Sequence, residues 1–260
     1  MMFVAAVACL GLARSAAVSR SPVPRCASRD ISSSATVRLS KSVTVDVVEK
    51  NVGISTQTWD AGIGTARWLA ASAASCIPGS RIVELGAGTG VCTLALGAST
   101  PGGMLDLTAT DIDDAALALL ERSAEMNRLE GLQTSRFDVC DDGARLPAAD
   151  ILVVSDLIYT KELASAVARR CCEALDRGMR VVVADPGRST RVTFFEALAS
   201  HGCCKHRGFQ CTAECTPFGE WVRGEAAAPP DSELFTVPPT STTTREGWTT
   251  PGLLLLLPPA

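Results

Sequence analysis

Three glycines spaced two residues apart form the clearest ligand-binding pattern in the sequence. Gly86, Gly88 and Gly90 lie in the run VELGAGTG at 83–90, between a predicted strand and a predicted helix. Glycine lets a backbone turn tightly and approach a bound molecule. A dinucleotide-binding loop would need glycine where Val91 stands, and a P-loop would need a lysine followed by serine or threonine. The pattern therefore indicates a ligand-binding loop that is neither a dinucleotide-binding loop nor a P-loop.

Two acidic side chains are expected beside this loop. Glu84 precedes the first glycine by two residues, and Asp111 ends the next predicted strand. In a doubly wound sheet, an acid at this position meets the ribose hydroxyls of a nucleoside ligand. The combination favours a nucleoside-containing cofactor. A glycine-rich turn in an unrelated α/β domain is the alternative.

The loop and its acids resemble the seven-strand S-adenosylmethionine-dependent methyltransferases. VELGAGTG is similar to their first motif and Asp111 to their ribose-binding acid, and the resemblance covers residues 40–215. It implies S-adenosylmethionine as cofactor, bound near Glu84 and the three glycines. It also implies an α/β fold with a doubly wound, mostly parallel seven-stranded sheet, the Rossmann-like class I methyltransferase fold, with an N-terminal β-hairpin.

Two further segments narrow the resemblance to a subgroup. The run TWDA at 58–61 precedes a predicted helix, and the run DLIY at 156–159 follows a predicted strand. They are similar to segments of the protein-lysine methyltransferases called methyltransferase family 16. This implies that Trp59 borders the cofactor, and that Asp156 and Tyr159 lie beside the acceptor amine, with Asp156 also close to the cofactor. It further implies a protein substrate that carries the acceptor lysine.

A third segment, FDV at 137–139, departs from that subgroup. Many of its members have Leu-Asp-Trp here, so the resemblance implies that Asp138 and Val139 border an adenine pocket without an aromatic wall. The run DPGR at 185–188 also resembles a segment of several members.

The expected chemistry is the methylation of an amine, which must be neutral to act as a nucleophile. Lysine has a pKa of about 10.4, so the site must orient and desolvate it, and Asp156 is placed to hold the ammonium until its proton leaves to solvent. Tyr159 could accept a hydrogen bond from the amine or line the channel. Other interpretations are a helix N-cap for Asp156, packing for Tyr159, a core anchor for Trp59 and a solvated side chain for Arg188.

Three functions stay open at this point. The resemblance favours a protein-lysine N-methyltransferase. A methyltransferase acting on a small-molecule acceptor would share the cofactor site and differ at its mouth. A non-catalytic cofactor- or metal-binding module would keep the fold and bind its ligand without catalysing a reaction.

Alternating strands and helices must position these residues. Such alternation predicts a parallel sheet with helices on both faces. The apolar pattern predicts a hairpin of 37–39 with 43–48, strands at 81–85, 105–110, 135–139, 151–154, 179–184 and 208–213, and helices at 61–74, 91–96, 113–127, 161–176 and 190–200.

The two ends differ from this middle. Residues 1–40 hold a short apolar segment and then an Arg- and Ser-rich stretch with one acidic residue, which indicates a targeting presequence. Its two-part order resembles the presequences of algal plastid proteins; mitochondrial import, secretion and a cytoplasmic chain without an address are the alternatives. We expect the methyltransferase domain at 41–224. A Pro/Thr-rich loop segment at 225–260 follows, with a candidate last strand in the five leucines at 253–257.

Composition excludes several other classes. The net charge of −4 argues against general nucleic-acid affinity, and the apolar runs are too short for stable membrane insertion. No pattern predicts an oligomeric state. Most of the eleven cysteines are expected to be buried or free thiols, including the Cys171-Cys172 pair. The spacing does not favour zinc in the cluster of His201, Cys203, Cys204, His206, Cys211 and Cys215.

Overall fold

The chain alternates strands and helices in a computed structural model, which describes residues 19–21, 32–72, 79–100, 105–201, 232–236 and 252–256. The strands are β1 Ser19–Ser21, β2 Ser32–Arg38, β3 Thr44–Lys50, β4 Arg81–Leu85, β5 Asp106–Asp111, β6 Gln133–Arg136, β7 Ile151–Ser155, β8 Arg180–Asp185, β9 Ser232–Thr236 and β10 Gly252–Leu256. The helices are α1 Asp60–Ser72, α2 Val91–Ser99, α3 Asp114–Met126, α4 Lys161–Asp176 and α5 Arg191–Ser200.

The main sheet has seven strands in the order β6-β5-β4-β7-β8-β10-β9. The first five are parallel, and β10 runs antiparallel to both β8 and β9. The order reverses between β4 and β7, so the loops after these two strands lie at a switch point, where ligands of open α/β sheets bind. The predicted doubly wound, mostly parallel fold is confirmed.

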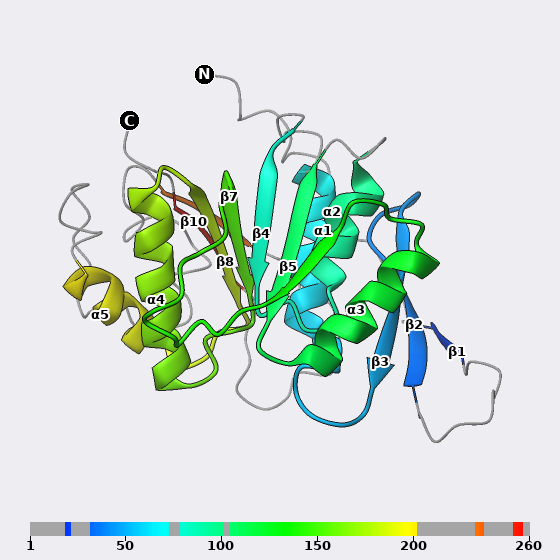
Figure 1. Cartoon of the computed structure of the whole chain (residues 1–260), viewed down its shortest axis with the longest axis horizontal. Helices are drawn as coiled ribbons and strands as arrows, with labels where there is room; N and C mark the ends of the chain where they lie inside the picture. The colour runs from blue at the N-terminus through cyan, green and yellow to red at the C-terminus, as the bar shows by residue number, and fades with distance from the viewer. Residues whose placement is uncertain are drawn as a thin grey trace.

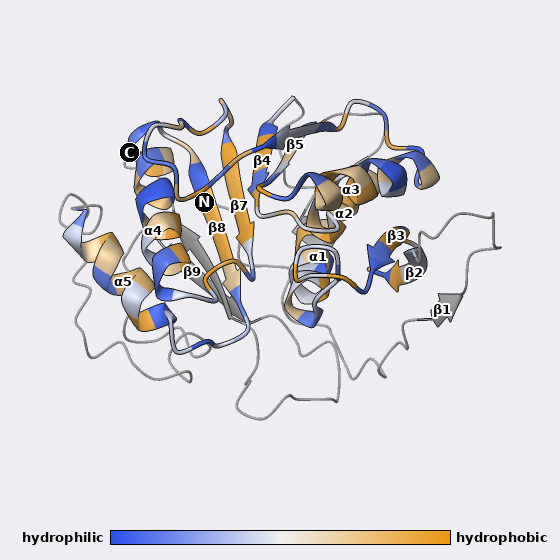
Figure 2. Ribbon diagram, turned by 60° about the horizontal axis from the view of Figure 1, so that its bottom comes forward, coloured by the Kyte–Doolittle hydropathy of each residue, from blue (hydrophilic) through white to orange (hydrophobic). Residues whose placement is uncertain are grey.

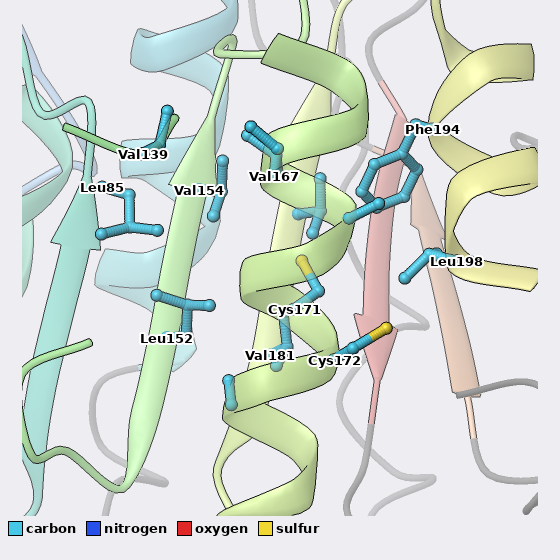
Figure 3. Close-up of a cluster of buried hydrophobic side chains, with 14 of the residues drawn as sticks. Leu85, Val139, Leu152, Val154, Val167, Cys171, Cys172, Val181, Phe194 and Leu198 are labelled. Atoms are coloured by element: carbon cyan, nitrogen blue, oxygen red, sulfur yellow. The ribbon is translucent and has the colours of Figure 1, made fainter. Parts of the chain in front are cut away.

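Helices cover both faces of this sheet (Figure 1). One core cluster joins β4, β7 and β8 to α4 and α5, and the other joins the opposite face to α1, α2 and the β2–β3 hairpin. The central strands are strongly hydrophobic, whereas the helices also present hydrophilic residues (Figure 2). Figure 3 shows the first cluster, in which Phe194 and Leu198 of α5 face α4.

The predicted N-terminal hairpin is present and is joined to α3. β2 and β3 pair antiparallel, with β1 on the outer side of β2. The backbone N–H of Asp46 donates to Asn127 Oδ1 (2.9 Å), and that of Val48 donates to Ser123 Oγ (2.8 Å). These bonds hold β3 against the C-terminal part of α3.

Three predictions need correction, two about strands and one about a cysteine. β6 ends at Arg136, before the predicted 139. The Phe137 N–H still donates to Asp111 O of β5, but the chain then turns, and the Asp138 carboxylate accepts the Cys140 N–H. Within the segment expected to be loop, β9 forms a strand through its pairing with β10, the candidate last strand. Cys171 is a free thiol, but Cys172 forms a disulfide bond.

Some predictions concern residues that the structure does not describe. The strand expected at 208–213 and the cysteines at 203–215 lie outside the described residues, as does most of the expected presequence. Among the described residues, no cluster of His, Cys, Asp and Glu could hold a metal ion. No helix within those same ranges has the length and hydrophobicity to cross a membrane.

Candidate active site

The glycine loop connects β4 to α2 with an unusual backbone. Gly86, Gly88 and Gly90 have φ angles of 62°, 55° and 79°, in the left-handed region that favours glycine. A Cβ on Gly86 would lie 2.6 Å from Leu157 Cδ1, and one on Gly90 would overlap Leu120. The loop therefore fits tightly against its neighbours only because these residues have no side chain.

Glu84 lies beneath the loop, where it holds α2 in place. Its side chain points toward α2 and is buried, and its carboxylate accepts the N–H of Thr93 (3.0 Å) and the Thr93 hydroxyl. Burial raises the pKa of Glu84 to about 7, although the bonds from Thr93 oppose the shift. The carboxylate thus fixes the first turn of α2 to β4.

Asp111, at the end of β5, is bonded to the loop. Asp111 Oδ2 accepts the Gly88 N–H and Oδ1 accepts the Asp113 N–H, both at 2.9 Å. The residue is only 6% exposed, and burial raises its pKa. The structure therefore brings Asp111 and the middle glycine together, as expected for one binding site.

The β3–α1 loop lies across the glycine loop. Ser55 Oγ donates to Asp113, Thr58 Oγ1 lies 2.9 Å from Thr89 Oγ1, and a Cβ on Gly88 would lie 3.0 Å from Ser55 O. Trp59 is half-buried at the end of this loop, with its indole N–H donating to Ile54 O (2.9 Å). Its placement beside the glycine loop is compatible with the expected contact with a cofactor.

The segment after β6 lies next to Asp111. The Phe137 N–H donates to Asp111 O (3.0 Å), which places Asp138 and Val139 directly beyond the end of β5. Asp138 is half-exposed and Val139 is buried. Arg170 of α4 supports this segment from below, donating through Nε to Val139 O (3.2 Å).

Asp156 follows β7 at the same edge of the sheet, in a strained conformation. Its φ is +56°, which is uncommon for a residue other than glycine and is often found at functional sites. Its N–H donates to Ala184 O (2.8 Å), and its side chain is only 6% exposed. Burial raises the pKa of Asp156 to about 6, against the lowering effect of Arg188.

Arg188 and Tyr159 flank this carboxylate. Arg188 Nε donates to Asp156 Oδ1 (3.0 Å), and Nη2 donates to the same oxygen. The guanidinium also lies 5.8 Å from the centre of the Tyr159 ring, within the range of a cation–π contact. Tyr159 is 37% exposed, so one ring reaches both the buried ion pair and the surface.

These contacts bear on the alternative interpretations of Asp156, Tyr159 and Arg188. The N-cap of α4 is Thr160, whose Oγ1 accepts the Leu163 N–H (3.1 Å), so Asp156 is not the cap. Tyr159 is 37% exposed, and its ring lies against the Arg188 guanidinium rather than in a hydrophobic core cluster. Arg188 is only 19% exposed and ion-paired, so the solvated interpretation is wrong.

Sequence reasoning missed several residues at this edge. Ser55 connects the β3–α1 loop to α3, and nothing in its type or spacing distinguishes it from other serines. Ile54 and Ile112 are large apolar side chains that are 58% and 52% exposed. Ile112 directly follows Asp111, and its position next to the predicted ribose-binding acid is the one sequence signal that could have identified it.

Comparisons with known proteins agree with this geometry at the level of the family. The family model described as "Lysine methyltransferase" matches residues 39–201. A search of the curated proteins found no matching sequence. Among solved structures, TrmN from Thermus thermophilus has a TM-score of 0.49 at 19% identity, over 75% of this chain and 48% of that one. The chain thus spans about half the length of that protein.

Two other solved structures have similar scores. A TehB-like SAM-dependent methyltransferase from Corynebacterium glutamicum has a TM-score of 0.46 at 14% identity, over 75% of this chain and 87% of that one. A tRNA (uracil-54, C5)-methyltransferase from Pyrococcus abyssi, in complex with S-adenosyl-L-homocysteine, has a TM-score of 0.46 at 12% identity, over 85% of this chain and 43% of that one. Because the family model matches more than half of the chain, on which the glycine loop, Asp111 and Asp156 all lie, this protein belongs to the lysine methyltransferase family of S-adenosylmethionine-dependent methyltransferases.

Proposed function

We propose that this protein transfers a methyl group from S-adenosylmethionine to the side-chain amine of a lysine in a protein substrate. The observation that carries the proposal is the buried carboxylate of Asp156. Among the described residues, its Oδ2 has no hydrogen-bond partner, while Oδ1 accepts from Arg188. A buried acceptor without a donor is costly, so this oxygen is suited to a donor that arrives with a ligand, such as an ammonium group.

The residues around the glycine loop fit the cofactor. The loop has three left-handed glycines, and the buried carboxylate of Asp111 lies against its middle residue. We assign Trp59, Asp138 and Val139 to the border of the same site, with Gly86, Gly88, Gly90 and Asp111 at its centre. Glu84 acts from beneath, because its carboxylate accepts hydrogen bonds from Thr93 of α2. When bound, S-adenosylmethionine supplies a methyl group on a positively charged sulfonium.

Asp156 and Tyr159 then act on the acceptor. The Asp156 carboxylate holds and orients the lysine ammonium, and the amine becomes nucleophilic when its proton leaves to solvent. Burial raises the pKa of the Tyr159 phenol, so the ring stays neutral and can accept a hydrogen bond from the amine or line its approach. Exposure of Tyr159, Ile54 and Ile112 supports an acceptor that approaches from the surface, as a lysine of another protein would.

The test combines cofactor binding with labelling of proteins. The purified protein is titrated calorimetrically with S-adenosylmethionine, and is then incubated with methyl-labelled cofactor and cell extracts separated into organellar and cytosolic fractions. We expect binding, and label on lysine in a discrete protein band that Asp156→Ala abolishes. Asp150→Ala is the matched control, because this aspartate forms an exposed ion pair with Arg81 at the opposite edge of the sheet. Label confined to small metabolites, or no cofactor binding, would overturn the proposal.

A further inference from the structure

The ion pair of Arg188 with Asp156 is built into the fold rather than being a chance surface contact. Arg188 is 19% exposed and its partner 6%. The turn after β8 fixes its direction, because Asp185 Oδ1 accepts the backbone N–H groups of Gly187 (2.7 Å) and Arg188 (2.9 Å). Asp185 is itself fully buried and bonded to Arg191 Nε (2.6 Å). The guanidinium is therefore directed at Asp156 by a preorganised turn.

The two oxygens of Asp156 have different environments as a result. Oδ1 accepts hydrogen bonds from Nε and Nη2 of Arg188, whereas Oδ2 has no hydrogen-bond partner among the described residues. A donor that binds at Oδ2 does not need to displace Arg188. The structure thus keeps a fixed cation next to the place where a second cation is expected.

We propose that Arg188 is a positioning residue that orients Asp156 and sets the charge that the acceptor amine meets; this inference rests on the proposed function. An isolated carboxylate would stabilise the lysine ammonium and oppose the loss of its proton. A carboxylate that is already paired with Arg188 still accepts a hydrogen bond but offers a nearly neutral environment. The amine can then lose its proton to solvent, its lone pair forms the new C–N bond, and the C–S bond breaks with its electrons going to sulfur.

Arg188 also has to keep Asp156 ionised in a buried position. The charged and titratable groups near Asp156 are Arg188, Asp185 and Tyr159, and Asp185 is offset by Arg191. Of these, Arg188 is the one that lowers the pKa of Asp156. Arg188 Nε lies 3.0 Å from Asp156 Oδ1, and an opposite charge this close lowers a carboxyl pKa by about one to three pH units. Removal of the Arg188 guanidinium should therefore raise the pKa of Asp156 by that amount.

The experiment measures pH profiles of methyl transfer for the wild-type protein, Arg188→Met and Arg188→Lys, with Arg81→Met as control. Arg81 forms an exposed ion pair at the other end of β4. We expect the acidic limb of the Arg188→Met profile to move upward by about one to three pH units. If it moves by two, activity at pH 7 falls about tenfold and recovers by about pH 9. Arg188→Lys keeps the charge and should retain an acidic limb near that of the wild type.

A readout independent of methyl transfer separates this inference from the proposed function. The carboxyl carbon of Asp156, labelled with ¹³C and assigned with Asp156→Asn, is titrated by NMR in each variant. In Arg188→Met the pKa of Asp156 is expected to rise by the same amount as the acidic limb, with cofactor affinity within about threefold of the wild type. An unchanged Asp156 titration, or a loss of activity that is equal at every pH, would overturn the role of Arg188. If the pKa of Asp156 rises in Arg188→Met but no protein lysine is methylated, only the proposed acceptor is refuted.

Discussion

Replacement of Glu84 by glutamine tests how the glycine loop is held. Glu84 is 4% exposed, and no arginine, lysine or histidine is among the groups that shift its pKa, which burial raises from 4.5 to about 7. The folded protein thus binds this proton more tightly than the unfolded chain does. The stabilisation is complete below about pH 4.5 and is lost as the pH rises through about 7.

The magnitude follows from the size of the pKa difference. One pH unit corresponds to 1.36 kcal/mol, so a rise of about 2.5 units makes this group cost about 3 kcal/mol of stability between pH 4.5 and pH 8. In Glu84→Gln the side chain is neutral throughout and can still accept the Thr93 N–H. We expect the free energy of unfolding of the variant to rise by about 3 kcal/mol relative to that of the wild type between pH 4.5 and pH 8. Asp156 titrates in both proteins and cancels in the difference, and Asp111 is the smallest of the influences on the Glu84 pKa.

The assay is urea unfolding followed by circular dichroism at pH 5, 6, 7 and 8. The free energy of unfolding of the wild type should fall toward pH 8 more steeply than that of Glu84→Gln. Glu125→Gln, an exposed substitution on α3, should follow the wild type at every pH. Parallel pH profiles for the wild type and Glu84→Gln would refute the reasoning, because they would show that Glu84 does not change its charge in this range.

Two further substitutions test the parts of the site on either side of Asp111. Gly88→Arg should abolish binding of S-adenosylmethionine in calorimetric titration, because φ is +55° and a Cβ there would already lie 3.0 Å from Ser55 O; retained affinity would show that the loop is misplaced. Arg170 is 2% exposed and donates to Ala144 O and Glu173 Oε2, both at 2.8 Å, with its guanidinium 5.0 Å from the Phe137 ring. Arg170→Met should cost about 3 kcal/mol in urea unfolding, and a loss below about 1 kcal/mol would contradict the buried ion network.

Local signals predicted most of the fold. The strand predicted at 151–154, the hairpin strand at 43–48 and the helix at 113–127 depend on neighbouring residues only, and each is found close to its predicted bounds. The end of β6 was placed wrongly, and β9 was not predicted. β6 is short, and three of its four residues are exposed, so apolar periodicity could not mark its ends. β9 depends on pairing with β10, a contact between segments that are separate in the sequence.

The sequence alone determined the family, the cofactor and the placement of the glycines and acids at strand ends, because these depend on residue type, spacing and the geometry of parallel strands. Only the tertiary structure decided what each carboxylate contacts. Glu84 turns toward α2, Asp111 toward Gly88, and Asp156 toward Arg188, which lies 32 residues further along the chain. Burial and charge depend on groups that only folding brings together. The protonation of these three acids is therefore a property of the folded protein.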